Sequence, residues 1–232
     1  MKTIVDRRAD LEKRASKEII NNIEKLLEDQ DYINLGIVGG SSVSGIFNHL
    51  KDSKLAWDKV HIFMVDERLV PLDSDESNFK LAKESFLDKL IESGKLTEEN
   101  LHPFIYDSSQ KNYGLNKYRK ELDKYGGKMD IVILSAGEDG HTASLFPKHQ
   151  SIKEDFDSYI LVDNSPKPPV RRISASKNLI LKSRISFLLF FGQKKADAYK
   201  SFLDKDISIE ECPVKLVKDI DESYIFTDIL LD

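Results

Sequence analysis

The residues best suited to chemistry lie in the stretch Gly-Glu-Asp-Gly-His that runs from Gly137 to His141. Gly137 and Gly140 allow the backbone to turn sharply and to approach a bound molecule closely. Asp139 and His141 place a carboxylate and an imidazole two positions apart in this turn. An imidazole can take a proton from water near neutral pH and return it to a leaving oxygen. The spacing therefore indicates general acid–base chemistry centred on His141.

Two other kinds of catalysis find little support in the chain. The remaining histidines show neither HxxxH nor HxxEH spacing and have no cysteine partners, so we expect no metal site and interpret them as structural or surface residues. They are His49, His61, His102 and His149. Ser144 lies outside any GxSxG context, which argues against a serine nucleophile.

A glycine- and serine-rich turn, Gly39, Gly40, Ser41 and Ser42, follows an apolar stretch and precedes a helical pattern. Backbone N–H groups, two hydroxyls and the positive end of a helix would meet there, which is the arrangement that a phosphate group needs. The spacing matches neither GxGxxG nor the P-loop motif, so a small phosphorylated molecule fits better than a nucleotide. An ordinary tight turn with a serine helix cap is the alternative.

Charged residues form short clusters at three further points in the sequence. Asp66, Glu67 and Arg68 follow an apolar strand, and Arg68 could bind substrate oxygens while the two carboxylates orient it; a structural ion-pair cluster is the alternative. Two other loops carry cationic side chains that together could provide a local positive cluster for a phosphate. The alternative is that each of these side chains is simply exposed to solvent. These cations are Arg171 and Arg172 after Pro168-Pro169, and Lys194 and Lys195 after Gly192.

Alternating helical and strand patterns would position these segments. A helix is predicted from Leu11 to Leu27, where apolar residues recur every four positions. Strands and helices then alternate, which predicts an α/β fold with a doubly wound, mainly parallel sheet covered by helices on both faces. Ligands bind at the carboxyl ends of such strands, where the candidate segments lie. The predicted strands are residues 32–38, 60–65, 101–106, 130–134, 159–162, 185–191 and 224–227, and the predicted helices after the first are residues 43–50, 78–90, 112–125 and 194–203.

Length and composition favour one small-molecule enzyme domain. The chain has 232 residues, a formal net charge of −5 and one cysteine. We expect a single domain over residues 1–232, no nucleic-acid partner, no membrane segment and no signal peptide, and therefore a cytoplasmic protein. Residues 165–169 are interpreted as a stiff active-site loop. A monomer is the default expectation, although the sequence does not determine the oligomeric state.

Taken together, the segments resemble the 6-phosphogluconolactonase family, within the larger group that includes glucosamine-6-phosphate deaminase. The resemblance runs in order through the glycine-serine turn, Asp66-Glu67-Arg68 with Ser77-Asn78 after it, the string GEDGHTASLFP over residues 137–147, Pro168-Pro169 with its arginines, and the turn at residues 192–196. Two positions depart from the family pattern. Ser42-Val43 stand where Thr-Pro is usual, and Ser135 stands where a glycine is usual.

The resemblance implies hydrolysis of 6-phosphogluconolactone to 6-phosphogluconate in the oxidative pentose phosphate pathway, without a cofactor. By position, His141 is the general base, Asp139 its polar neighbour and Arg68 a substrate contact. The implied phosphate pocket comprises the turn of Gly39, Gly40, Ser41 and Ser42 together with Arg172 and Lys195. The doubled Arg171-Arg172 and Lys194-Lys195 leave the register open by one, and the residues that follow favour Arg172 and Lys195.

Two alternatives remain at this point. A glucosamine-6-phosphate deaminase or isomerase shares the fold, but that branch usually has a tyrosine after Asp-Glu and reads like IAFNEP after Asp-Gly-His. Here Arg68 and residues 142–147 (TASLFP) favour the lactonase. The other alternative is a noncatalytic sugar-phosphate-binding module, which would leave Asp139 and His141 without an evident use.

Overall fold

A seven-stranded parallel sheet forms the centre of the protein, as shown by a computed structural model that describes residues 1–231. Its strand order is β1-β10-β9-β6-β2-β3-β5, and every neighbouring pair is parallel. The predicted doubly wound, mainly parallel α/β class is therefore confirmed. The strands are β1 (Lys2–Val5), β2 (Ile33–Ile37), β3 (Val60–Met64), β5 (Leu101–His102), β6 (Ile131–Ser135), β9 (Ile185–Phe190) and β10 (Glu222–Thr227).

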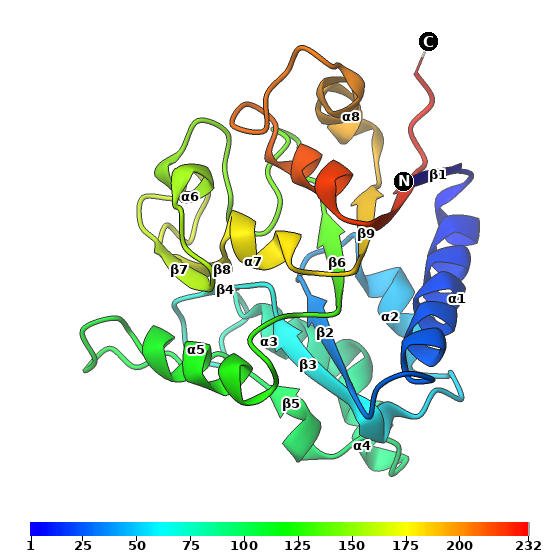
Figure 1. Cartoon of the computed structure of the whole chain (residues 1–232), viewed down its shortest axis with the longest axis vertical. Coiled ribbons are helices and arrows are strands. Elements are labelled where there is room, and N and C mark those ends of the chain that lie inside the picture. Colours follow the sequence, from blue (N-terminus) through cyan, green and yellow to red (C-terminus); the bar gives the residue numbers. More distant parts are fainter. Residues whose placement is uncertain (232) are drawn as a thin grey trace.

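Helices cover both faces of this sheet (Figure 1), with α1 and α2 on one side and α5 and α7 on the other. Helix α1 turns Leu11, Ala15, Ile19 and Ile23 inward, and all four side chains are fully buried. This spacing of about one turn explains why the helical pattern was readable from the sequence. The longer helices are α1 (Arg8–Leu26), α2 (Ser44–Leu50), α5 (Leu115–Lys124) and α8 (Ala196–Leu203).

Short helices make up the rest of the helical structure. The predicted helix at residues 78–90 is present, but a π-helical turn (Lys83–Leu87) divides it into α3 (Asn78–Ala82) and α4 (Asp88–Glu92). Other short helices are α6 (Gln150–Lys153), α7 (Lys177–Leu181) and the 3₁₀ turns Trp57–Lys59, Glu98–Asn100, Gln193–Lys195 and Pro213–Asp219. Within residues 1–231, no helix combines the length and the apolar character needed to cross a membrane.

A separate antiparallel sheet lies beside the carboxyl ends of the main strands. It consists of β4 (Asp66–Arg68), β8 (Arg172–Ala175) and β7 (Tyr159–Val162), in that order. The sequence predicted β7 but not its place in a second sheet, and it did not predict β4 or β8. Both missed strands are short, and β4 consists entirely of charged residues, of which aspartate and glutamate are depleted in strands.

The prediction of a strand over residues 101–106 is wrong beyond His102. Pro103 follows directly, and proline has no N–H group to continue the hydrogen-bond ladder with β3. Beyond that point, the hydroxyl groups of Tyr118 and Tyr159 form hydrogen bonds to the backbone of β3 in place of a neighbouring strand. The Met64 N–H donates to Tyr118 Oη at 2.7 Å, and Tyr159 Oη donates to the Met64 carbonyl at 2.9 Å. The edge of β3 is thus completed by side chains.

Candidate active site

A cavity of about 220 Å³ lies where the carboxyl ends of the central strands meet. It brings together residues from the loops after β2, β3, β6 and β9, as the topology requires of a parallel sheet. Every predicted site residue lines it except Asp139, which contacts one that does. The lining residues are Val38, Gly39, Gly40, Ser41, Ser42, Asp66, Arg68, Asn78, Ser135, Ala136, His141, Ala143, Arg172 and Lys195.

The His141 imidazole is held in the tight turn that follows β6. The Gly137 N–H donates to the His141 carbonyl at 2.8 Å, and Gly140 has φ of +83°. A Cβ atom on Gly137 would lie 2.0 Å from the imidazole ring, so only glycine permits this packing. His141 Nδ1 forms a short hydrogen bond with Asp139 Oδ1. With Nδ1 engaged, Nε2 is the nitrogen left for chemistry.

Asp139 is suited to hold this imidazole as an ionised carboxylate. Burial alone raises the pKa of Asp139, but the hydrogen bond and charge of His141, together with Lys167, hold that pKa well below its usual range. The side chains of Asp139 and His141 are 36% and 17% exposed, so the pair is sheltered yet reachable from the cavity. A fixed carboxylate of this kind selects the imidazole tautomer with its proton on Nδ1.

Lys195 lines the cavity and contacts two serines there. Its Nζ donates to Ser42 Oγ at 2.9 Å and to Ser135 Oγ at 3.1 Å. Burial, and secondarily the nearby Arg8, lower the pKa of Lys195 to about 8. Such a lysine gains a full positive charge when an anion binds beside it. The exposed Lys194 does not line the cavity, so Lys195 is the one of the two lysines that lies at the candidate site.

Arg68 is positioned by Glu67 through the backbone and not by an ion pair. The buried Glu67 carboxylate accepts from the Arg68 N–H at 2.8 Å and caps the start of α3, accepting from Asn78 and Phe79 N–H groups at 2.8 Å. Arg68 Nη1 donates to the Glu76 carbonyl, and within residues 1–231 its buried Nε has no partner. Arg68 also lines the cavity, so its guanidinium lies where it could bind a substrate oxygen.

Arg172 lines the cavity, but most of its donors are used by the protein itself. Nε donates to the Pro169 carbonyl at 3.0 Å, and Nη2 donates to the carbonyls of Lys167 and Pro168 at 3.2 and 3.1 Å. Its Nη1 lies 3.9 Å from Asp66 Oδ2. Arg171 points elsewhere, toward Tyr113 and Asp163. Arg172 therefore anchors the loop before β8 as well as facing the cavity.

Arg8 and Lys167 were not identified as site residues from the sequence, and Asn78 was noted only as part of the resemblance, without a role. Arg8 donates from Nη2 to the Ser41 carbonyl at 2.6 Å, and Asn78 donates to the Asp66 carbonyl at 2.9 Å. Lys167 Nζ lies 3.5 Å from Asp139 Oδ1. Arg8 is 33 positions from its partner, and no sequence pattern marks that contact. For Asn78, the Ser77 helix cap was a signal for a helix start next to Arg68.

The residues set aside at the sequence level have structural contacts. Ser144 is fully buried and donates to Asp66 Oδ2 at 2.7 Å, so its hydroxyl is engaged. His149 caps α6 by accepting from the Ser151 N–H at 3.1 Å. Within residues 1–231, no cluster of three or more His, Cys, Asp or Glu side chains is arranged to hold a metal ion.

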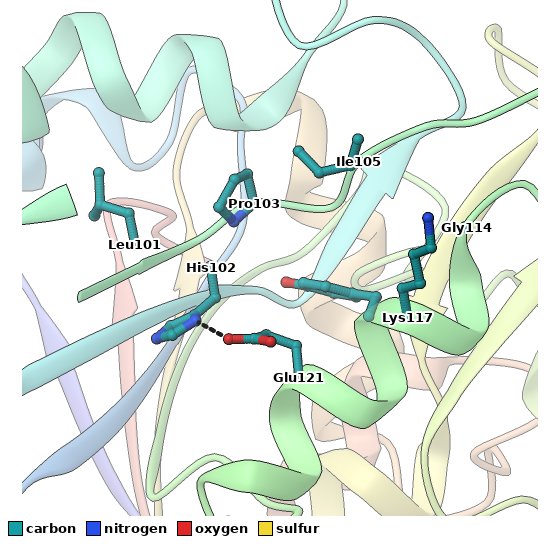
Figure 2. Close-up of a pocket in the computed structure, with 8 residues that line it drawn as sticks. Leu101, His102, Pro103, Ile105, Gly114, Lys117 and Glu121 are labelled. Carbon is teal, nitrogen blue, oxygen red and sulfur yellow. Dashed lines mark hydrogen bonds and ion pairs between the residues drawn. The ribbon is translucent and has the colours of Figure 1, made fainter. Parts of the chain in front are cut away.

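A second cavity, also of about 220 Å³, lies between β5 and α5 (Figure 2). His102 lines it and contacts Glu121 at 3.1 Å, and burial together with the neighbouring His61 lowers the pKa of His102 to about 4. Glu121 is also paired with Lys124 at 2.6 Å. Besides His102, the lining has one cation, Lys117, and one carboxylate, Glu121, among apolar residues such as Leu101 and Ile105, so this cavity has no cluster of positive charge like that at the first one.

Comparison with known proteins identifies the family. The sequence profile described as glucosamine-6-phosphate isomerases/6-phosphogluconolactonase matches residues 6–226. A 6-phosphogluconolactonase of Borreliella burgdorferi is 34% identical over 205 residues, covering 88% of this chain and 87% of the relative. The crystal structure of 6-phosphogluconolactonase from Thermotoga maritima superposes with a TM-score of 0.83 at 27% identity, covering 97% of each chain. This chain therefore belongs to the glucosamine-6-phosphate isomerase/6-phosphogluconolactonase family.

Proposed function

We propose that this protein hydrolyses 6-phosphogluconolactone to 6-phosphogluconate, with His141 as the general base. The observation that carries the proposal is the His141–Asp139 pair opening onto a cavity whose other walls supply Lys195, Arg172 and the turn after β2. The named relatives are lactonases of this substrate class, and their similarity covers most of the chain. The substrate combines an ester to be opened with a phosphate to be held.

In the first step, His141 Nε2 accepts a proton from a water molecule as its oxygen attacks the lactone carbonyl carbon. The C–O bond that forms moves negative charge onto the carbonyl oxygen. The Arg68 guanidinium, which lines the cavity, is a donor suited to that charge, and stabilisation of such an oxyanion commonly contributes several kcal/mol (~2.7–4) to catalysis. Asp139 stabilises the positive charge that develops on the imidazole.

In the second step, the tetrahedral intermediate collapses and the bond to the ring oxygen breaks. His141 Nε2 returns its proton to that oxygen, which becomes the new hydroxyl of the opened sugar acid. The carboxylic acid formed then loses a proton to solvent. His141 is neutral again, and the protein itself is unchanged after one turnover.

The phosphate would be held away from the reacting carbonyl. We place it at Lys195 and the Gly39, Gly40, Ser41 and Ser42 turn, where a lysine, hydroxyls and backbone N–H groups converge. A fixed contact of this kind stabilises the ground state and the transition state alike, so its loss should raise KM more than it lowers kcat.

The decisive experiment replaces His141 by asparagine. We expect His141→Asn to fold but to lose about 10²–10⁴-fold in kcat, which is the usual contribution of general acid–base catalysis. The assay uses freshly prepared 6-phosphogluconolactone with spontaneous hydrolysis subtracted, and a coupled dehydrogenase reports 6-phosphogluconate. The exposed His49 on α2 provides the matched control, His49→Asn. Near-normal turnover of the His141 variant, or release of ammonia from glucosamine 6-phosphate by the native protein, would contradict the proposal.

We also propose that the chain forms a single domain and that the protein is cytoplasmic. One continuous buried core includes residues of both sheets, such as Ile133 of β6 and Ile173 of β8, which supports a single lactonase domain over residues 1–232. A sugar-phosphate substrate and a lone buried thiol, Cys212, fit the cytoplasm. Cell fractionation tests the location, and limited proteolysis tests the single domain.

A further inference from the structure

Lys167 introduces a cation next to the catalytic pair. It belongs to the loop of residues 163–171 between β7 and β8, and its Nζ lies 3.5 Å from Asp139 Oδ1. That oxygen is also the one that pairs with His141 Nδ1. The Asp139 carboxylate therefore lies between the Lys167 ammonium and the His141 imidazole and contacts both.

The loop that carries Lys167 is fixed from beneath by Arg172. Arg172 is 5% exposed, and its guanidinium donates to the carbonyls of three successive residues, Lys167, Pro168 and Pro169. Ser165 adds a hydrogen bond from its Oγ to the Lys167 carbonyl at 2.9 Å, and its N–H donates to the Val170 carbonyl at 2.9 Å. The backbone of Lys167 is therefore well defined, although its side chain is 41% exposed.

We propose that Lys167 is a positioning residue that pairs with Asp139 and thereby keeps the His141 imidazole neutral and ready to accept a proton. This inference rests on the proposed function of the same site. An isolated carboxylate favours the protonated imidazole beside it, and a neighbouring ammonium offsets part of that attraction. Asp139 still orients the ring through Nδ1, but it binds a smaller share of imidazolium in the resting state.

Other charges around the pair are already engaged or lie farther along the cavity. Asp66 of β4 contacts Ser144 and faces Arg172. Arg68 donates to the Glu76 carbonyl. Lys195 donates to Ser42 and Ser135. Glu138 lies in the turn itself, and uncharged Cys212 packs against Gly140. Among residues 1–231, Lys167 is the lysine or arginine found within 4 Å of the Asp139 carboxylate.

The test compares the pH dependence of kcat/KM in Lys167→Met and Lys167→Arg. In the methionine variant we expect the acid limb to move to higher pH by several tenths of a unit, up to about one, because protonated imidazole is now favoured. KM and the plateau value of kcat should change less than about threefold. The arginine variant keeps the charge and should keep the native profile. Lys120→Met, on the exposed face of α5, controls for the loss of one positive charge.

An independent readout does not depend on turnover. The imidazole proton signals of His141, followed by NMR across the same pH range, should titrate at higher pH in Lys167→Met than in the native protein. If Lys167→Met keeps the native pH profile but has a raised KM, Lys167 contacts substrate. If it keeps the native pH profile and kcat is lower at every pH, Lys167 has a structural role. Either result overturns the inference. If the native protein lacked lactonase activity, the proposed function would fail, while the NMR titration would still test the pairing.

Discussion

At the scale of single residues, we expect the proposed phosphate contact of Lys195 to couple substrate binding to proton uptake. Its pKa lies near 8 because of burial and the proximity of Arg8, so a substantial fraction is neutral at that pH. A bound phosphate dianion favours the charged form, and the protein should therefore take up about half a proton per ligand at pH 8. Above pH 8 the neutral amine predominates, and affinity should fall as pH rises. Calorimetric titration with 6-phosphogluconate in buffers of different ionisation enthalpy measures this uptake.

The control for this prediction is the neighbouring lysine. Lys195→Met should bind the product more weakly and abolish this component of proton uptake, whereas Lys194→Met, which alters an exposed side chain outside the cavity, should preserve it. Equal proton uptake in native protein and Lys195→Met would show that another group titrates on binding.

Single residues also show how far the sequence predicts the site. His141, Arg68, Lys195 and the turn after β2 could be grouped because each follows a strand of one parallel sheet, where loops converge. The contacts of Lys167 were not predictable, because they depend on how a loop of the second sheet folds over the first. Nor did spacing reveal that the donors of Arg172 are largely occupied by carbonyl groups.

At the scale of elements, helix α1 supports the candidate phosphate turn from outside. Arg8, in its first turn, donates to the Ser41 carbonyl and lies over the Phe191 ring, 5.4 Å from its centroid. We expect Arg8→Met to raise KM for the phosphorylated lactone about 3- to 10-fold, the equivalent of roughly 1 kcal/mol for a partly exposed charge, with little effect on kcat. Steady-state kinetics of the variant measure both constants.

The adjacent arginine separates this local effect from a general loss of charge. Arg7 is 87% exposed and pairs with Asp10, so Arg7→Met should keep the native KM. Hydrolysis of the unphosphorylated gluconolactone should be equally slow in native protein and Arg8→Met. If Arg8→Met hydrolysed both lactones more slowly to a similar extent, Arg8 would be needed for folding and not for phosphate binding.

Elements with strong apolar patterns were predictable, and short or polar ones were not. Strands β2, β3, β6 and β9 are apolar runs, and each was predicted within one residue at either end. Strand β1 is a peripheral strand with one buried residue, Ile4, so its sequence carries little pattern. Strand β5 ended early because Pro103 removes a donor, a local effect that a hydrophobic run does not reveal.

At the scale of the whole molecule, function depends on how the two sheets are joined. Strand β3 of the main sheet leads within one residue into β4 of the small sheet, which carries Arg68, and β8 carries Arg172 and follows the Lys167 loop. The site therefore lies at the junction of the sheets. The sequence predicted the main sheet and the edge at which ligands bind, but the junction depends on pairings between strands more than 90 positions apart.

Met64 is the point at which this junction can be tested. Tyr118 Oη accepts from the Met64 N–H, while both Tyr118 and Tyr159 donate to the Met64 carbonyl. Tyr159→Phe leaves that carbonyl with one donor and should cost about 0.5–1.5 kcal/mol of unfolding free energy, whereas Tyr118→Phe leaves a buried N–H without an acceptor and should cost about 1–3 kcal/mol.

Denaturant unfolding measures both losses, and in a thermal scan Tm should fall by about 2–4 °C for each kcal/mol lost. Tyr32→Phe, at a residue that is 37% exposed, is the control. Equal losses in the two buried variants would mean that the Met64 N–H finds another partner, and that Tyr118 does not complete the edge of β3.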